Sequence, residues 1–69
     1  MLTSRECEII RLIALGLPTR VIADRMCISI ETVKSHRKNI IRKIPDLTDS
    51  PKALLEFAIA FEKEREKSL

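Results

Sequence analysis

Apolar residues recur along this chain at intervals of three and four, the spacing that predicts amphipathic helices. Turn-forming residues interrupt the pattern at positions 16–18, 27–29 and 45–50. We therefore expect an all-α fold, a compact four-helix domain that contains a helix-turn-helix. The helices are predicted over residues of about 4–15, 19–26, 30–44 and 51–66. No repeat or linker divides the 69 residues, so residues 1–69 are predicted to form a single domain.

Capping signals mark the predicted helix ends. Thr3 and Glu6 have the T-x-x-E spacing of a capping box, in which each side chain accepts a hydrogen bond from a free amide of the first turn. Gly16, the only glycine, falls where a left-handed residue would end the first helix. Ser29 and Ser50 are placed to cap the third and fourth helices. Only three residues separate the second helix from the third, and helices joined so tightly form a helix-turn-helix.

The third predicted helix has two different faces. At about 100° per residue, its apolar residues form one stripe and its polar residues a neighbouring one. The apolar stripe consists of Ile30, Val33, Ile40, Ile41 and Ile44, and the polar stripe of Glu31, Lys34, Ser35, Lys38 and Arg42. Five basic residues of this helix stand against one acid. A helix with one face buried and a basic face exposed is the kind of element that enters a DNA major groove.

The distribution of charge says more than the net charge of +3. Residues 1–44 hold nine Lys/Arg and four Asp/Glu, a balance of +5, whereas residues 45–69 hold four and six, a balance of −2. A polyanion is therefore the expected partner of the first two-thirds of the chain. Aromatic residues make up only 3% of the chain, too few for a surface that stacks the bases of single strands.

Other function classes find little support in the sequence. Cys7 and Cys27 are isolated and His36 is the only histidine, which excludes an ordinary zinc site, and no metal or cofactor is expected. The two cysteines are expected to be reduced residues of the core or its boundary, with a disulfide between them as the alternative. Capping and surface charge account for Glu6 and Glu8. Without a catalytic triad or a phosphate-binding glycine loop, the chain is not expected to be an enzyme.

The fourth predicted helix has more apolar residues than one face can hold. Its main stripe consists of Leu54, Phe57, Ala58 and Phe61. Leu55 and Ile59 lie off that stripe, and no further element is predicted to cover them. We therefore expect them to form an interface with a partner chain, although they would also fit the exposed edge of a small domain.

Taken in order, the motifs of the chain match a known pattern. The chain opens with L-T-x-R-E, followed by I-I-x-L-I and by G-L-P with I-A three residues on. I-S-x-x-T-V-K-x-H then precedes N-I and R-K-I. Together these motifs of residues 2–44 closely resemble the LuxR/NarL-type (GerE-like) helix-turn-helix DNA-binding domain of bacterial transcription regulators. The resemblance implies that the second and third helices form the helix-turn-helix and that the fourth makes a dimer contact.

The resemblance also implies roles for particular residues. Side chains that contact bases in the family fall here on Lys34, Ser35 and Lys38, which can hydrogen-bond base edges. Arg37 stands where the family usually has an apolar residue, and its stem would pack while its guanidinium reaches a phosphate. Cys27 replaces a more usual larger turn residue, and the fourth helix is longer and more acidic than usual. The remaining DNA-backbone contacts implied by the family are Thr19, Arg20, Thr32, His36 and Arg42.

We therefore expect a sequence-specific, double-stranded-DNA-binding transcription regulator, or the output domain of one, acting as a homodimer. The sequence has no signal peptide and no apolar run of about 20 residues, which predicts a place in the bacterial cytoplasm, at the nucleoid, and no membrane partner. A contact with RNA polymerase is a further candidate. Two alternatives stay open: region four of a sigma factor, which has a similar L-T-x-R-E opening and T-V-K helix, and a helical protein-interaction module. A receiver or ligand-sensing domain upstream is equally compatible with the sequence.

Overall fold

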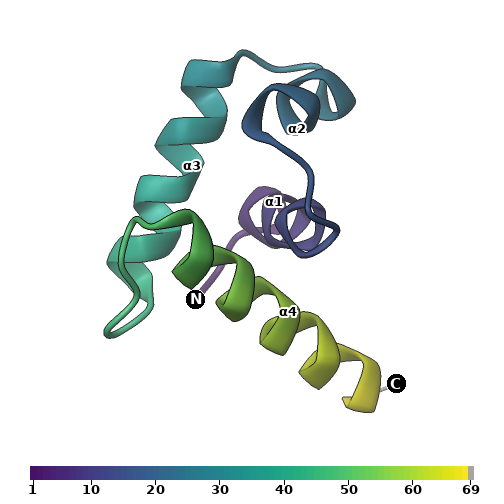
Figure 1. The fold of residues 1–69 in the computed structure, drawn as a ribbon, viewed down its shortest axis with the longest axis vertical. Coiled ribbons are helices and arrows are strands. Elements are labelled where there is room, and N and C mark those ends of the chain that lie inside the picture. Colours follow the sequence, from purple (N-terminus) through teal and green to yellow (C-terminus); the bar gives the residue numbers. More distant parts are fainter. Residues whose placement is uncertain (69) are drawn as a thin grey trace.

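The computed structural model describes residues 1–68, and over these residues it contains four helices and no strand. The helices are α1 (Ser4–Ala14), α2 (Thr19–Met26), α3 (Ile30–Lys43) and α4 (Pro51–Ser68), as Figure 1 shows. The predicted all-α fold with four helices is thus confirmed. Differences at the ends are small: α1 and α3 each end one residue earlier than predicted, and α4 ends two residues later.

α1 begins and ends as its sequence predicts. The Oγ1 atom of Thr3 accepts a hydrogen bond from the Glu6 amide at 3.1 Å, and Oε1 of Glu6 accepts one from the Thr3 amide at 2.8 Å. At the other end Gly16 has a φ of 82°, in the left-handed region that glycine adopts without cost. The amides of Gly16 and Leu17 donate back to carbonyls of the last turn, the pattern of a Schellman motif.

Cys27 ends α2 in the left-handed conformation, with a φ of 57°, as Gly16 does after α1. The amides of Cys27 and Ile28 donate back into the last turn of α2 at 3.2 and 3.0 Å. The prediction that both cysteines belong to the core or its boundary is wrong for Cys27, which is exposed because it turns the chain at the surface. Cys7 is half-buried, as predicted, and both cysteines are free thiols.

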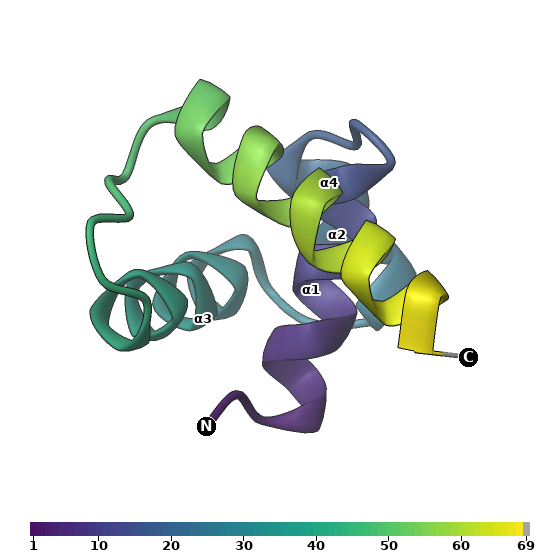
Figure 2. The same ribbon diagram turned by 90° about the horizontal axis from the view of Figure 1, so that it is seen from below.

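Serine side chains cap the two remaining helices, as predicted. Ser29 Oγ accepts a hydrogen bond from the Thr32 amide at 3.1 Å at the start of α3. Ser50 Oγ accepts one from the Ala53 amide at 3.0 Å at the start of α4. Residues 44–50 connect the two helices and turn the chain back, so that α4 crosses α1 (Figure 2).

Apolar residues from all four helices meet in one core. α1 is its centre, because it packs against each of the other three helices. Figure 1 shows α2 above α1, α3 to its left and α4 below it, so that the three helices surround α1. The buried apolar residues are Ile9, Ile10, Ile22, Ala23, Met26, Val33, Ile40, Leu54 and Ala58. None of the helices described is both long and apolar enough to cross a membrane.

The predicted apolar stripe of α3 is right along most of the helix. Val33 and Ile40 are fully buried, and Ile41 and Ile44 are half-buried. Ile30 is 39% exposed, and its predicted burial is wrong. It is the first residue of α3 and precedes the turns of that helix that lie over the core.

Candidate nucleic-acid interface

The exposed face of α3 brings the predicted base-contacting residues together. Lys34, Ser35 and Lys38 are all exposed, and their spacing places them on one stripe within little more than a turn. The opposite face of the helix is anchored in the core by Val33 and Ile40. α3 therefore presents two long cationic side chains and one small hydroxyl away from the core, all of which can donate hydrogen bonds.

Other predicted contacts of α3 lie beside or on this stripe. On the helical wheel Thr32 and His36 flank it on one side, Arg37 flanks it on the other, and Arg42 lies on it. Thr32 and Arg42 are exposed, whereas His36 and Arg37 are half-buried. The hydroxyl of Thr32 lies 2.8 Å from that of Ser29, so it also belongs to the cap of α3.

The start of α2 leaves its first amides without a side-chain cap. Pro18 precedes the helix in an extended conformation and offers no side-chain acceptor. Thr19 is half-buried and Arg20 is exposed at this end. Free amides and the helix dipole give such a helix start a partial positive charge, which favours a nearby anion.

Arg37 is held by two internal hydrogen bonds. Its Nη1 donates to Thr19 Oγ1 at 3.2 Å, and its Nη2 donates to Asp49 Oδ1 at 3.1 Å. Only 22% of the Arg37 side chain is exposed, against 61% of that of Asp49. The structure thus brings two predicted phosphate contacts, Thr19 and Arg37, into contact with each other.

Three exposed cations of the α3 face are held loosely or not at all. Lys34 Nζ lies 3.8 Å from Glu31 Oε1, and because both side chains are exposed this pair contributes little stability. Within residues 1–68 no hydrogen bond or ion pair engages the side chain of Lys38 or that of Arg42. Lys34, Lys38 and Arg42 therefore leave their charges directed to the solvent.

The fifth cation of α3, Lys43, forms an ion pair with the buried carboxylate of Glu6. Glu6 is 2% exposed, and its Oε1 accepts hydrogen bonds from Lys43 Nζ and from the Thr3 amide, both at 2.8 Å. The hydrogen bond from Lys43 lowers the pKa of Glu6 and outweighs burial, which acts to raise it; the hydrogen bonds with Thr3 lower it further. The pair fastens the last turn of α3 to the first turn of α1.

The sequence interpretation missed this pair, since it assigned Glu6 to the cap alone and Lys43 to the basic helix. The two residues are 37 positions apart, too far for any local pattern to connect them. One signal was present: Glu6 lies three and four positions before Ile9 and Ile10, on the stripe of α1 that is buried. A carboxylate on a buried stripe needs a partner.

α4 has a core-facing side and an exposed apolar side. Leu54 and Ala58 are 3% and 1% exposed, so the predicted main stripe of α4 packs into the core. Leu55 follows Leu54, and Ile59 follows Ala58. These two residues are 36% and 38% exposed and lie one turn apart. The two side chains named as an interface thus form an exposed apolar pair on one side of α4.

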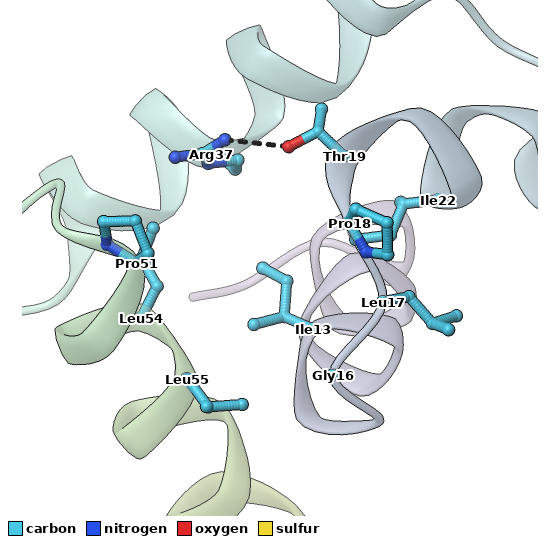
Figure 3. A pocket seen from close by; sticks show the side chains of 10 residues that line it. All are labelled: Ile13, Gly16, Leu17, Pro18, Thr19, Ile22, Arg37, Pro51, Leu54 and Leu55. Atoms are coloured by element: carbon cyan, nitrogen blue, oxygen red, sulfur yellow. Dashed lines mark hydrogen bonds between the residues drawn. The ribbon is translucent and has the colours of Figure 1, made fainter.

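An apolar cleft of about 250 Å³ opens where α1 ends and where α2 and α4 begin (Figure 3). Leu54 and Leu55 line its α4 side, and Arg37 reaches across its α3 side toward Thr19. The cleft therefore separates α2 from α4, and the guanidinium lies between them. No part of residues 1–68 gathers three or more side chains of the types that ligate metals.

Comparison with known proteins gives a consistent set of matches. The family described as bacterial regulatory proteins, luxR family, matches residues 1–46, which include α1, α2 and α3. The transcriptional regulatory protein DegU of Brevibacillus brevis is 39% identical over 56 residues, 81% of this chain and 23% of DegU. The nitrate/nitrite response regulator protein NarL of Escherichia coli (strain K12) is 49% identical over 43 residues, 62% of this chain and 20% of NarL.

A third relative, the response regulator protein VraR of Staphylococcus aureus (strain NCTC 8325), is 44% identical over 55 residues, 80% of this chain and 26% of VraR. The chain thus spans about a quarter of the length of the curated relatives it matches. No solved structure gives a significant match. With two-thirds of the chain inside the family match, and the helix-turn-helix inside that part, the chain belongs to the luxR family of bacterial regulatory proteins, a family of DNA-binding transcription regulators and not of enzymes.

Proposed function

We propose that this domain places α3 in the major groove of double-stranded DNA and reads sequence there, as the output domain of a bacterial transcription regulator. The observation that carries the proposal is the exposed stripe of Lys34, Ser35 and Lys38, on a helix whose other face is fixed in the core. A helix of this kind fits the width of the major groove and keeps its orientation there because the core holds it.

The chemistry of the stripe suits direct readout of bases. Lys34 and Lys38 can donate to the O6 and N7 acceptors of guanine, and Ser35 can donate or accept. Lys38 has no internal partner within the described residues, and Lys34 has only its weak pair with Glu31. Neither lysine must break a strong internal bond before it contacts a base.

Phosphate contacts would fix the register of α3 in the groove. Arg20 stands at the uncapped start of α2, where amides and a guanidinium can bind one phosphate together. Arg42 has an unengaged charge on α3, and we assign further backbone contacts to residues that flank the stripe. The flanking residues proposed for such contacts are Thr19, Thr32 and His36, whereas the guanidinium of Arg37 already donates to Thr19 and Asp49.

We further propose that two copies of the chain pair through Leu55 and Ile59. Their exposed apolar surface on α4 supports this, since a partner would remove it from water. The two copies of α3, the recognition helix, would then be linked and would read two half-sites. As part of a bacterial regulator the chain would act in the cytoplasm, at the nucleoid, where a contact with RNA polymerase becomes accessible.

The assignment of roles is tested by comparing Lys38→Ala with Arg42→Ala. A preferred duplex is first selected from a random pool with the wild-type chain, for which we expect a Kd of about 10⁻⁸ M or weaker. Lys38→Ala should cost about 1–3 kcal/mol on that duplex and relax the preference at one base pair. Arg42→Ala should weaken binding to all duplexes alike and reduce the magnitude of the salt slope by about one.

Arg11→Ala provides the matched control, because Arg11 is an exposed cation on α1 and lies outside both the α3 stripe and the exposed apolar pair of α4. This variant should bind like the wild type. If Lys38→Ala and Arg42→Ala lose the same affinity on every sequence, the division into base-reading and phosphate-binding residues is wrong.

A further inference from the structure

Arg37 occupies a junction between three segments of the chain. It lies on α3, beside the exposed stripe, and its side chain is mostly covered. One hydrogen bond reaches Thr19, the first residue of α2, and the other reaches Asp49 in the connection between α3 and α4. Figure 3 shows the guanidinium directed at Thr19, with the start of α4 on its other side. One side chain therefore joins residues 18 and 12 positions away from it.

The connection at Asp49 bears directly on the placement of α4. Asp49 precedes Ser50, whose side chain caps α4 by accepting from the Ala53 amide and whose carbonyl accepts from the Leu54 amide at 3.0 Å. As far as residues 1–68 are described, the backbone of α4 runs close to that of α1 and to that of no other helix. The Arg37–Asp49 bond is thus a polar link that holds the start of α4 to the recognition helix.

Asp49 is also an acid among the cations of the exposed face. A hollow of about 140 Å³ is lined by Lys34, Arg37, Lys38 and Asp49. Of these cations, Arg37 is the one that Asp49 contacts at hydrogen-bond distance. The carboxylate neutralises the covered guanidinium and leaves the two lysines to face DNA.

We propose that Arg37 is a positioning residue, which ties α3 to the start of α2 and to the α3–α4 connection, and so fixes the orientation of α4 relative to the recognition helix. Its consequence for DNA rests on the proposed function. If α4 pairs two copies, a fixed angle between α4 and α3 sets the distance between two recognition helices. Arg37 then acts on the binding of two half-sites together, and much less on the binding of one.

The tie, meaning the two hydrogen bonds of Arg37 to Thr19 and Asp49, is tested in the free protein. NMR measures how fast backbone amides exchange their hydrogens with the solvent. Arg37→Met keeps an apolar stem and removes both hydrogen bonds. Asp49→Asn leaves the bond to Thr19 intact and removes the negative charge from the acceptor of the other bond. Both variants should speed exchange of the Ala53 and Leu54 amides about fivefold or more, with the Ile40 amide unchanged. Arg25→Met, the same change at an exposed residue at the far end of α2, should alter none of these rates.

Two results of this experiment would overturn the tie. One is unchanged exchange at Ala53 and Leu54 in both variants, which would mean that the bonds do not hold the start of α4. The other is equally faster exchange at Ile40, which would mean that Arg37 supports the whole fold and not the orientation of one helix.

The effect on DNA is measured on duplexes with one half-site and with two. Arg37→Met should lower affinity for two half-sites about tenfold and for one half-site no more than about twofold, with an unchanged salt slope. Equal losses on both duplexes, with a salt slope reduced by about one, would make Arg37 a phosphate ligand and overturn the proposal. If the wild type binds no duplex, the proposed function fails, while the exchange experiment still decides whether the tie exists.

Discussion

Removing Lys43 from its pair with the buried carboxylate of Glu6 should cost a large share of the stability of so small a domain. Lys43→Met removes the ammonium group but keeps most of the apolar stem, and it leaves the Glu6 carboxylate buried with only the Thr3 amide as partner. Breaking a fully buried pair from one side costs about 3–5 kcal/mol. Because 35% of the Lys43 side chain is exposed, solvent screens the pair, and we expect a loss of about 2 kcal/mol.

That loss is large compared with the total free energy of unfolding. A chain of 69 residues is expected to have a free energy of unfolding of about 3–10 kcal/mol. The loss should lower Tm by about 8–16 °C at pH 7. Tm is measured by circular dichroism during thermal unfolding. Lys63→Met is the matched control, because it removes an exposed lysine of α4 and should change Tm by much less.

The pH dependence gives a second, independent check on the same pair. The hydrogen bond from Lys43 holds the pKa of Glu6 below its ordinary value in the folded state. A carboxylate with a depressed pKa stabilises the fold in full above its unfolded pKa, and this contribution is lost as pH falls through the folded value. The gap in stability between the wild type and Lys43→Met should therefore narrow as pH drops below about 4.3. A gap below about 0.5 kcal/mol at pH 7, or one that stays constant down to pH of about 3, would refute this reasoning.

Three further changes follow from the structure. Cys27→Gly should raise the free energy of unfolding by about 0.5–1 kcal/mol, because the backbone of Cys27 is in the left-handed region, which glycine adopts without a steric cost. A drop in Tm would contradict this. Gly16→Ala should lower it by about 1 kcal/mol through backbone strain alone, since no atom lies within 4 Å of the added methyl group, and an unchanged Tm would contradict this. Ile59→Glu should give a monomer in sedimentation experiments, with unchanged helicity, and a dimer that persists would place the interface elsewhere.

Features set by neighbouring residues could be predicted from the sequence. The capping box of Thr3 and Glu6, the left-handed Gly16 and the Ser50 cap each depend on atoms only a few positions apart. The exposed stripe of α3 follows from helical geometry once the apolar stripe is known. These local signals account for the close agreement between the predicted and observed helix ends.

Features set by tertiary contacts could not be predicted in this way. The partners of Lys43 and Arg37 lie 37, 18 and 12 positions away, and a long cationic side chain can reach many places. The left-handed conformation of Cys27 comes from the tight turn between α2 and α3, and the residue type gives no hint of it. The sequence showed how many cations α3 carries, and only the fold showed that two of the five are engaged inside it.

The central claim, that this domain binds DNA through the cations of α3 and the start of α2, is tested most directly by one titration. Wild-type chain is titrated into a labelled duplex of the selected sequence at salt concentrations from about 50 to about 300 mM. With Arg20 and Arg42 each neutralising a phosphate, the logarithm of the binding constant should fall linearly with the logarithm of salt concentration, with a slope of about −2 or steeper. Absence of binding at the lowest salt, or an affinity that does not change with salt, would contradict the account.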